Sequence, residues 1–366
     1  MSSKKKLSEK GIFVKGFHDS LLTSANSIKN KNKKTYKIFS FFKKKVICNL
    51  LKQIPECFPI PKKRKICSSF SLLKLFPENL VIDFNQKNFP IGERKAIERL
   101  NKFCVDKIDK YVLKRNFPFL NSTSMLSPYL SLGIISPRYC LKVILKKYKK
   151  IPLNIILNSD WLNQIIWREF YYHLLIGFPM LSQSQSLIIW EKKIKWKHNV
   201  NYFNAWKNGN TGFPIIDAGM RQLNKMGWMH NRLRMITSSF LVKNLLINWR
   251  EGEKYFMSNL IDGDFALNNG GWQWSASTGS DSVPYIRIFN PLNQSKNFDK
   301  SGLFIRKYIP ELNSVPDRYI HNPYEWSIKN NCTINYPEPI IDYKKSKEQA
   351  LEVYNKAQLT SKKEKV

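Results

Sequence analysis

The chain has 366 residues, of which 43% are hydrophobic and 13% aromatic, and its formal net charge is +34. It can bury a large core and has room for two domains, and no apolar run reaches membrane-spanning length, so we expect no membrane partner. The basic excess favours a polyanion, and we expect nucleic acid, although a general bias toward Lys, Asn and Ile explains part of the charge. Six Cys are scattered without a CxxC pair, which predicts reduced thiols in a cytoplasmic protein and no metal site.

The N-terminal part of the sequence predicts little regular structure. Residues 1–25 predict the end of a helix and one short strand, GIFVKGF (11–17). A single strand cannot satisfy its edges, so we interpret this segment as the remnant of an α/β domain whose beginning is missing. Residues 26–93 are basic, irregular and rich in Pro, and we interpret them as a partly ordered linker on the surface.

From residue 94 onward the apolar residues follow a helical period, and strand patterns are almost absent. Gly and Pro residues divide this part into segments. The predicted helices cover 92–112, two short segments within 126–148, then 159–179, 215–226, 230–249 and 252–260. We therefore predict a mainly α domain over 94–343, followed by a Lys-rich tail over 344–366 that ends as a frayed helix.

The segment NNGGWQWSASTG (268–279) is the most unusual part of the chain. Paired Gly residues allow close approach of another group to the backbone, and two Trp rings offer stacking surfaces. Asn, Ser and Thr side chains could orient a planar aromatic ligand. An aromatic-rich turn without a ligand is an equally good interpretation of this segment alone.

Two other segments combine aromatic and charged residues. In WLNQIIWREF (161–170), residues Trp161, Gln164 and Arg168 share a helical face that could hold a ring and a phosphate. For this segment alone, a half-buried helix with a solvent-reaching Arg is the better interpretation. In GWMHNRLRM (227–235), Arg234 is a candidate salt-bridge partner for Asp262 in the IDGD sequence (261–264). Asp262 or Asp264 could instead bind a ligand or cap a helix.

Hydroxyl side chains precede the helix predicted near residue 127. Thr123, Ser124 and Ser127 could form an anion site at a helix start, or could serve only as caps.

Together these segments resemble the photolyase/cryptochrome family of flavoproteins. The match runs from about residue 16 to 343 and is densest over 211–256 and 261–291. The MHNRLRM form (229–235) is similar to the branch that acts on cyclobutane pyrimidine dimers. The resemblance implies a fold with an all-helical FAD-binding domain, preceded here by a remnant of an α/β antenna domain and a long linker. It also implies a monomeric, light-driven repair enzyme.

The resemblance further implies which residues hold FAD. Asn268 would lie at flavin N5 and favour the reduced state. The other implied FAD ligands are Tyr111, Thr123, Ser124, Met125, Leu126, Ser127, Trp161, Arg168, Arg234, Asp262, Gly263 and Asp264. We expect Asn268, Asp262, Trp161 and Trp274 to line one cavity.

The resemblance also implies the residues that act on DNA and on the flavin. Trp272, Trp249 and Trp196 match a relay that photoreduces the flavin. A flipped-out pyrimidine dimer would stack on Trp167 and Trp274. Further DNA contacts are implied for Arg115, Gln164, Arg168, Asn231, Arg232, Met235, Arg287 and Gln294. Phosphate contacts would supply affinity, and the dimer would leave the base stack to be repaired.

Three features depart from the family pattern. Only the end of the N-terminal antenna domain is matched. Ser182 and Gln183 replace the Cys-Lys pair that helps to hold a second chromophore in folate-antenna photolyases, so we expect that chromophore to be lost. Gln164 replaces a glutamate that contacts the dimer, which predicts a lowered repair yield.

Two other functions remain open at this stage. A cryptochrome-like photoreceptor would bind flavin without repairing DNA, and Gln164 favours it. A basic DNA-binding protein without flavin is the third possibility.

Overall fold

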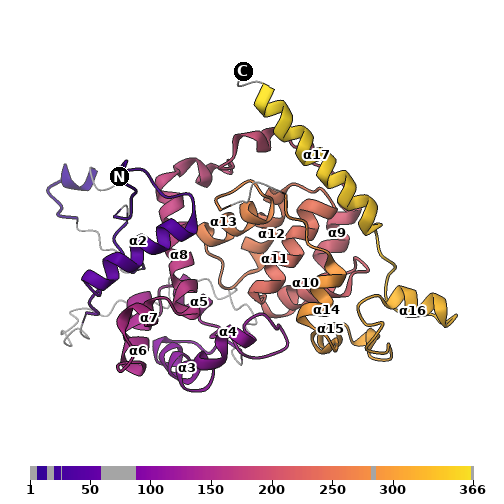
Figure 1. Ribbon diagram of the computed structural model, residues 1–366, viewed down its shortest axis with the longest axis horizontal. Helices are drawn as coiled ribbons and strands as arrows, with labels where there is room; N and C mark the ends of the chain where they lie inside the picture. The colour runs from indigo at the N-terminus through magenta and orange to yellow at the C-terminus, as the bar shows by residue number, and fades with distance from the viewer. Residues whose placement is uncertain (1–5, 15–19, 26, 59–87, 282–285, 364–366) are drawn as a thin grey trace.

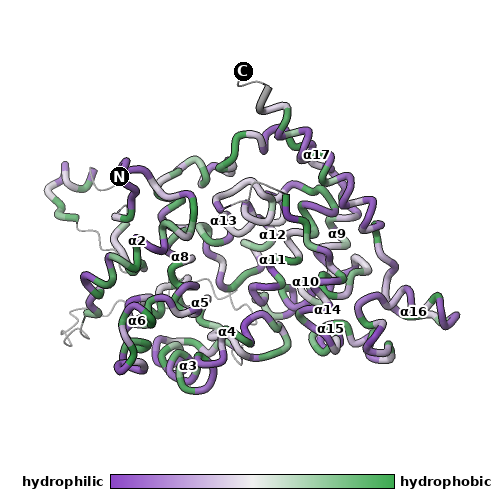
Figure 2. Tube along the Cα trace, in the orientation of Figure 1, coloured by the Kyte–Doolittle hydropathy of each residue, from purple (hydrophilic) through white to green (hydrophobic). Residues whose placement is uncertain are grey.

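The chain is described here from a computed structural model, which covers residues 6–14, 20–25, 27–58, 88–281 and 286–363. Across these ranges the regular structure is helical, with two isolated β-bridges and no strand (Figure 1). No helix in the described ranges is long and apolar enough to cross a bilayer. Purple and green alternate along most helices in Figure 2, as expected of helices that bury one face.

Helices of the N-terminal part surround one group of buried apolar side chains, which we term the first core and which extends from Leu22 to Leu181. Its central helix is α8, whose side chains Ile165, Ile166 and Phe170 are at most 4% exposed. The elements of this part are α2 (Phe39–Lys52), α3 (Glu93–Asp106), η3 (Ile108–Lys110), α4 (Tyr111–Lys114), α5 (Ser127–Ser131), α6 (Pro137–Lys147), α7 (Leu153–Leu157), α8 (Asp160–Gly177) and η4 (Pro179–Gln183).

A second core, extending from Trp206 to Tyr336, lies among the helices of the C-terminal part. Its most deeply buried members include Trp206, Trp249 and Trp272. The elements here are η5 (Ile189–Lys193), α9 (Val200–Asn208), α10 (Pro214–Met226), α11 (Asn231–Ser239), the π-helical η6 (Phe240–Asn244), α12 (Trp249–Asn259), α13 (Phe265–Ser275), α14 (Pro291–Phe298), α15 (Leu303–Tyr308), η7 (Pro310–Leu312) and α16 (Pro323–Lys329).

The C-terminal helix α17 (Tyr343–Lys363) runs along the edge of the second core (Figure 1). Ala350 and Tyr354 are fully buried and Ala357 is 2% exposed, and they pack with Ile194 and Leu246. The Lys243 ammonium lies 3.6 Å from the centre of the Tyr354 ring. The predicted frayed tail is therefore a packed helix, because small and aromatic residues at helical spacing give it an apolar face.

The predicted mainly α domain is confirmed, and most of its helices fall where the apolar period places them. Two details are wrong. The helix expected over 230–249 breaks after Asn244, and Leu246 adopts a positive φ of 52° before α12 begins. The strand expected at 11–17 is absent from residues 11–14, where no partner strand is present among the described residues, and the remainder lies outside them.

The segment interpreted as a linker contains a helix that the sequence analysis missed. Helix α2 buries Phe42, Val46 and Leu50 against the first core. Its burial follows from apolar residues at helical spacing, which the surrounding Lys and Pro residues obscured. Much of the rest of this segment, residues 59–87, lies outside the described residues, so the boundaries of the linker stay a prediction.

Candidate functional site

The candidate site lies along the seam where helix α8 of the first core meets helix α13 of the second. Gly270 makes this close packing possible, because a Cβ at that position would lie 2.1 Å from Cδ1 of Tyr171. Only Gly270 of the Gly pair is required for this helix contact, because a Cβ at Gly271 would meet nothing within 4 Å. The unusual Gly/Trp segment lies mostly within helix α13 (Phe265–Ser275) and is not a turn. The Asp264 side chain caps this helix by accepting from the Leu267 N–H at 3.1 Å.

Side chains from the two cores meet across this seam. The Tyr172 hydroxyl donates to Asp264 Oδ2 at 2.6 Å, and the Ser131 hydroxyl donates to the Gly263 carbonyl at 2.9 Å. The Trp228 indole donates to the Ser127 hydroxyl at 3.2 Å. Three of the residues predicted to hold the cofactor, Ser127, Gly263 and Asp264, therefore lie at this junction although they are distant in sequence.

The predicted salt bridge between Arg234 and Asp262 is present. Both oxygens of Asp262 accept from Nη2 of Arg234, at 3.0 and 2.7 Å, and the carboxylate side chain is only 2% exposed. The guanidinium also donates from Nε to the Met229 carbonyl, which fixes its orientation. Neighbouring Asp264 caps α13, so one carboxylate serves as an ion pair and the other as a cap.

Asn268 is held in one orientation on α13. Its Nδ2 donates to the Glu253 carbonyl at 2.9 Å, while the Glu253 carboxylate accepts from Asn269 Nδ2 at 3.4 Å. Burial raises the pKa of Glu253. The Asn268 oxygen makes no hydrogen bond within the described residues, so it is left to accept from a ligand.

The predicted phosphate-binding segment leads into α5. Met125 has a positive φ of 50°, and Leu126 is buried in the first core. Thr123 and Ser124 are half-buried and Ser127 is exposed, so their hydroxyls lie near the surface. No side chain caps α5, so these hydroxyls do not serve as helix caps.

Three more predicted cofactor residues lie in the first core. Tyr111 is 8% exposed beneath Arg115, and Trp161 is 4% exposed against Phe103. Arg168 is 5% exposed. Its guanidinium donates to the Ser20 and Leu130 carbonyls and lies 4.6 Å from the Tyr172 ring centre. Arg168 therefore ties the N-terminal segment to α8.

Two of the three tryptophans of the predicted relay lie at helix α12, and the third lies against α17. A Cβ at Gly252 would lie 2.1 Å from Cη2 of Trp272, so the Trp272 ring lies directly on α12. Trp249 begins the same helix three residues earlier, on the same face. Trp196 is half-buried beside Tyr354, with ring centres 6.2 Å apart.

The two tryptophans predicted to stack on a pyrimidine dimer have different surroundings. Trp274 and Arg287 line one cavity together with Ser239, Asp281 and other residues. Trp167 has one ring face covered by Phe39 of α2, with ring centres 3.6 Å apart and planes 6° from parallel. A stacked base could therefore use only the opposite face of Trp167.

The other predicted DNA contacts fall into local pairs. Arg232 donates to Asn116 at 2.8 Å and lies over the Phe298 ring, and Arg115 is 3.6 Å from the Asp160 carboxylate. Gln164 donates to the Asp160 carbonyl at 3.3 Å. Asn231 contacts the sulfur of Met235 at 3.8 Å, and the Gln294 oxygen is buried without a hydrogen bond.

The expected common cavity does not coincide with either of two cavities found among the described residues. One is lined by Trp274 and Arg287, and the other by Tyr171, Asn269 and Gly270 between α8 and α13. Neither is lined by Asn268, Asp262 or Trp161. No cluster of three or more His, Cys, Asp or Glu residues able to hold a metal occurs in the described ranges.

Sequence reasoning missed four polar or aromatic residues of this region: Phe39, Glu191, Arg250 and Glu253. Phe39 was assigned to the linker, and the acidic residues carry no motif. Glu191 and Glu253 could have been suspected only because acidic residues are scarce in so basic a chain.

His230 immediately precedes α11 and provides a prediction about acid stability. It is 3% exposed, its Nδ1 accepts from the Arg232 N–H, and burial lowers its pKa to about 4. A folded-state pKa below the unfolded value means that His230 favours folding above pH 6.5, and that this contribution is lost as pH falls toward 4. Between pH 7 and 4, the wild type should lose about 3 kcal/mol more unfolding free energy than His230→Asn, a variant that can retain the cap.

Denaturant unfolding at a series of pH values measures this effect. His198→Asn is the control, because His198 is exposed. Equal pH dependence of the wild type and the His230 variant would contradict the assignment.

Comparisons with known proteins place this site in context. A family model described as the FAD binding domain of DNA photolyase matches residues 161–356. The deoxyribodipyrimidine photo-lyase of Buchnera aphidicola subsp. Acyrthosiphon pisum (strain APS) is 64% identical over 356 residues, which cover 97% of this chain and 74% of that protein. The enzyme of the same name from Escherichia coli (strain K12) is 45% identical over 351 residues, which cover 95% and 74%.

Solved structures give the same result. A bacterial class III photolyase from Agrobacterium tumefaciens aligns with a TM-score of 0.82 at 36% identity, covering 98% of this chain and 76% of that one. A Synechocystis sp. PCC6803 cryptochrome aligns with a TM-score of 0.80 at 28% identity, covering 95% and 74%.

Proposed function

The chain belongs to the DNA photolyase family, and from this premise we propose that it repairs cyclobutane pyrimidine dimers in DNA by light-driven electron transfer with bound, reduced FAD. The observation that carries the proposal is the seam between α8 and α13. Candidate FAD ligands from both cores meet there, since Asp264 accepts from Tyr172, the Gly263 carbonyl from Ser131, and Ser127 from Trp228. The buried Asp262–Arg234 pair and the oriented amide of Asn268 lie next to these contacts in the chain.

The residues present fit a flavin. When bound, reduced FAD supplies the electron that opens the cyclobutane ring and receives it back, with no net redox change. Asn268 would accept the hydrogen at flavin N5 with its free amide oxygen, which favours the reduced state. The Trp272 indole nitrogen is buried without a hydrogen-bond partner, as expected of a donor left over at the wall of a ligand site.

The surroundings of Trp274 support DNA as the substrate. This ring shares a cavity with Arg287, so a stacking surface and a cation lie side by side. Trp167 would offer its face opposite Phe39. The net charge of +34 would attract the phosphate backbone.

Two measurements test the proposed repair activity. The absorption spectrum of the purified protein should show flavin, and dimer absorption in an irradiated oligothymidylate should disappear under blue light but not in the dark. A flavin-free protein would refute the cofactor assignment, and a flavin-loaded protein without light-dependent repair would refute the activity.

The second candidate function is a cryptochrome-like photoreceptor, which Gln164 favours. An amide can hydrogen-bond a substrate but cannot hold or give a carboxylic proton. Flavin photoreduction without dimer repair is the result that would favour this function.

We expect Gln164→Glu to raise the quantum yield of repair, by about twofold or more, because a carboxylic acid can both donate and accept hydrogen bonds to the dimer. Gln164 is half-buried near the start of α8, and its amide donates to the Asp160 carbonyl, so the substitution should not disturb the core. The yield is measured as dimers split per absorbed photon. Gln185→Glu, at an exposed site, is the control, and equal yields for wild type and Gln164→Glu would contradict the expectation.

We also propose that this chain lacks a folate-type antenna chromophore. Ser182 and Gln183 are exposed on η4, and Ser182 donates to the Pro179 carbonyl, so these short polar side chains present no cation to a carboxylated pterin. Stoichiometric pterin in the purified protein would overturn this proposal.

A further inference from the structure

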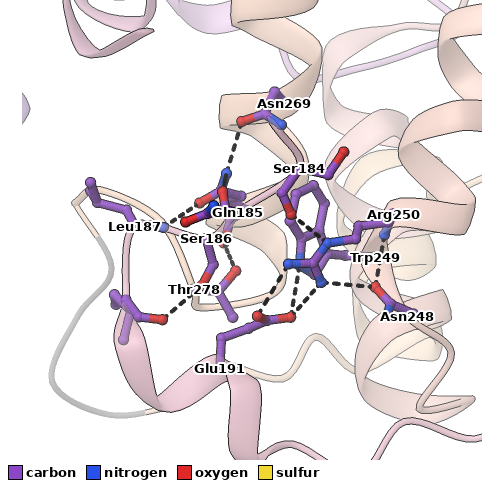
Figure 3. A network of polar contacts seen from close by, with 12 residues as sticks. Ser184, Gln185, Ser186, Leu187, Glu191, Asn248, Trp249, Arg250, Asn269 and Thr278 are labelled. Atoms are coloured by element: carbon purple, nitrogen blue, oxygen red, sulfur yellow. Dashed lines mark hydrogen bonds and ion pairs between the residues drawn. The ribbon is translucent and has the colours of Figure 1, made fainter. Parts of the chain in front are cut away.

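The tryptophans assigned to the relay share a buried acid. Glu191 is 3% exposed on η5, and its Oε1 accepts from the Trp249 indole N–H at 3.2 Å. The Trp196 indole also interacts with this carboxylate and lowers its pKa. Figure 3 shows Glu191 directed toward Trp249 and Arg250. One carboxylate thus accepts from one relay residue, Trp249, and interacts with a second, Trp196.

A guanidinium completes the arrangement. Arg250 Nη1 and Nη2 donate to the two oxygens of Glu191, at 2.6 and 3.2 Å, and the guanidinium carbon lies 4.5 Å from the centre of the Trp249 ring. Its orientation is fixed by the Ser184 carbonyl, which accepts from Nε at 2.6 Å, and by the Asn248 side chain (Figure 3). The Trp249 indole therefore has a fixed negative charge at its N–H and a fixed positive charge over its ring.

Glu191 is ionised in this environment. Burial raises the pKa of its carboxyl, but hydrogen bonds and attraction from Arg250, with the indole hydrogen bonds, outweigh burial and leave the pKa below its ordinary value. An ion pair in a buried site interacts with its neighbours strongly, because little water screens it.

These charges matter because the indole of a relay residue becomes a cation when it loses an electron. A carboxylate that accepts from the N–H stabilises that cation, and a guanidinium above the ring opposes it. In a neutral core, neither effect would exist.

Building on the proposed photoreduction relay, we propose that the Glu191–Arg250 pair sets the ease with which Trp249 is oxidised. Glu191 favours the positive charge on Trp249 and Trp196, and Arg250 limits it, so that the charge passes through Trp249 without being trapped there.

The electrons balance as follows. Trp272 gives one electron to the photoexcited flavin, Trp249 gives one to Trp272, and Trp196 gives one to Trp249. The net result is one electron moved from Trp196 to the flavin, and an external thiol reductant returns one electron to Trp196. Glu191 loses and gains no atom in these steps.

Flash absorption spectroscopy of the FAD-loaded protein, at pH 8.5 and without reductant, measures the yield of long-lived tryptophan radical. We expect Glu191→Gln, which keeps an acceptor oxygen but removes the charge, to lower this yield. The equilibrium constant for placing the positive charge on Trp249 should fall about tenfold, as expected when a charged hydrogen bond becomes a neutral one. Glu191→Asp, which keeps the charge, should retain most of the yield. Arg250→Gln should give a yield equal to or above wild type at pH 8.5, a pH chosen to keep Glu191 ionised once its partner is removed.

The opposite signs distinguish tuning from a structural role. If the pair only clamps η5 to α12, Glu191→Gln and Arg250→Gln should lower the yield together, and that result would overturn the proposal, as would an unchanged yield in Glu191→Gln. Trp249→Phe tests the relay itself. If Trp249→Phe loses the radical but Glu191→Gln has no effect, only the proposed tuning is rejected. If Trp249→Phe still shows full photoreduction, the relay itself is rejected.

A second readout requires no flavin. The indole N–H resonances of Trp249 and Trp196 in the flavin-free protein, assigned with Trp→Phe variants, should shift in Glu191→Gln if both indoles donate to this carboxylate. Unshifted resonances would contradict the geometry from which the proposal starts.

Discussion

Trp272→Phe is expected to lower the rate of light-driven FAD reduction by about a hundredfold or more, because phenylalanine is much harder to oxidise than indole and an increase of about 3 kcal/mol in the barrier has this effect. Trp272 is 2% exposed and lies against α12 at Gly252, with Phe256 packed edge-on at 4.9 Å between ring centres. The cavity left by the smaller ring should destabilise the fold by only about 1–2 kcal/mol. The rate is read from flavin absorbance under steady blue light with a thiol reductant.

The chain supplies a matched control in Trp206. This ring is fully buried in the same core, 6.0 Å from Trp272, and its indole donates to the Thr237 carbonyl. Trp206→Phe removes the same volume but no assigned relay residue, so photoreduction should continue. Loss of photoreduction in Trp206→Phe with retention in Trp272→Phe would contradict the assigned route.

Asp217→Ala is expected to lower the free energy of unfolding by about 3–5 kcal/mol, because it leaves several buried donors without an acceptor. Asp217 is fully buried and accepts from the Thr211 N–H and hydroxyl, at 2.8 and 2.6 Å, and from the Gly212 N–H at 3.0 Å. The Tyr336 hydroxyl also donates to it, from 119 residues further along the chain. Denaturant unfolding measures the change, and Tyr336→Phe, which removes one donor of the four, should cost much less.

The same residue predicts a pH effect. Burial raises the pKa of Asp217 to about 6 despite its hydrogen bonds to Thr211 and Tyr336. Its folded-state pKa thus lies above the unfolded value, so its contribution to stability is greatest below pH 4 and falls as pH rises through 6. The difference in unfolding free energy between wild type and Asp217→Asn should change across this pH range, and a difference that is constant from pH 4 to 7 would contradict the raised pKa.

Local sequence signals predicted most helices and one key contact. Gly227 ends α10 with a positive φ of 62°, and Pro137 begins α6, as the Gly and Pro positions in the sequence indicated. The Arg234–Asp262 ion pair was also predicted, since two acidic residues in so basic a chain need a partner. Predictions failed where a non-local contact decided the structure. The 11–17 segment has strand-like residues but no partner in residues 11–14, and α2 is a helix because α8 covers its apolar face.

The sequence by itself determined the family, the helical architecture and the identity of the aromatic, amide and charged residues available for flavin chemistry, because period, caps and motifs are local properties of the chain. Only the tertiary structure decided how those residues are used. It placed Phe39 on one face of Trp167, aligned the ligands of two cores along one seam, and set Glu191 and Arg250 around the Trp249 indole. Such contacts join distant residues, and Phe39 and Trp167 are 128 positions apart. No local pattern encodes which distant side chain will cover a given ring.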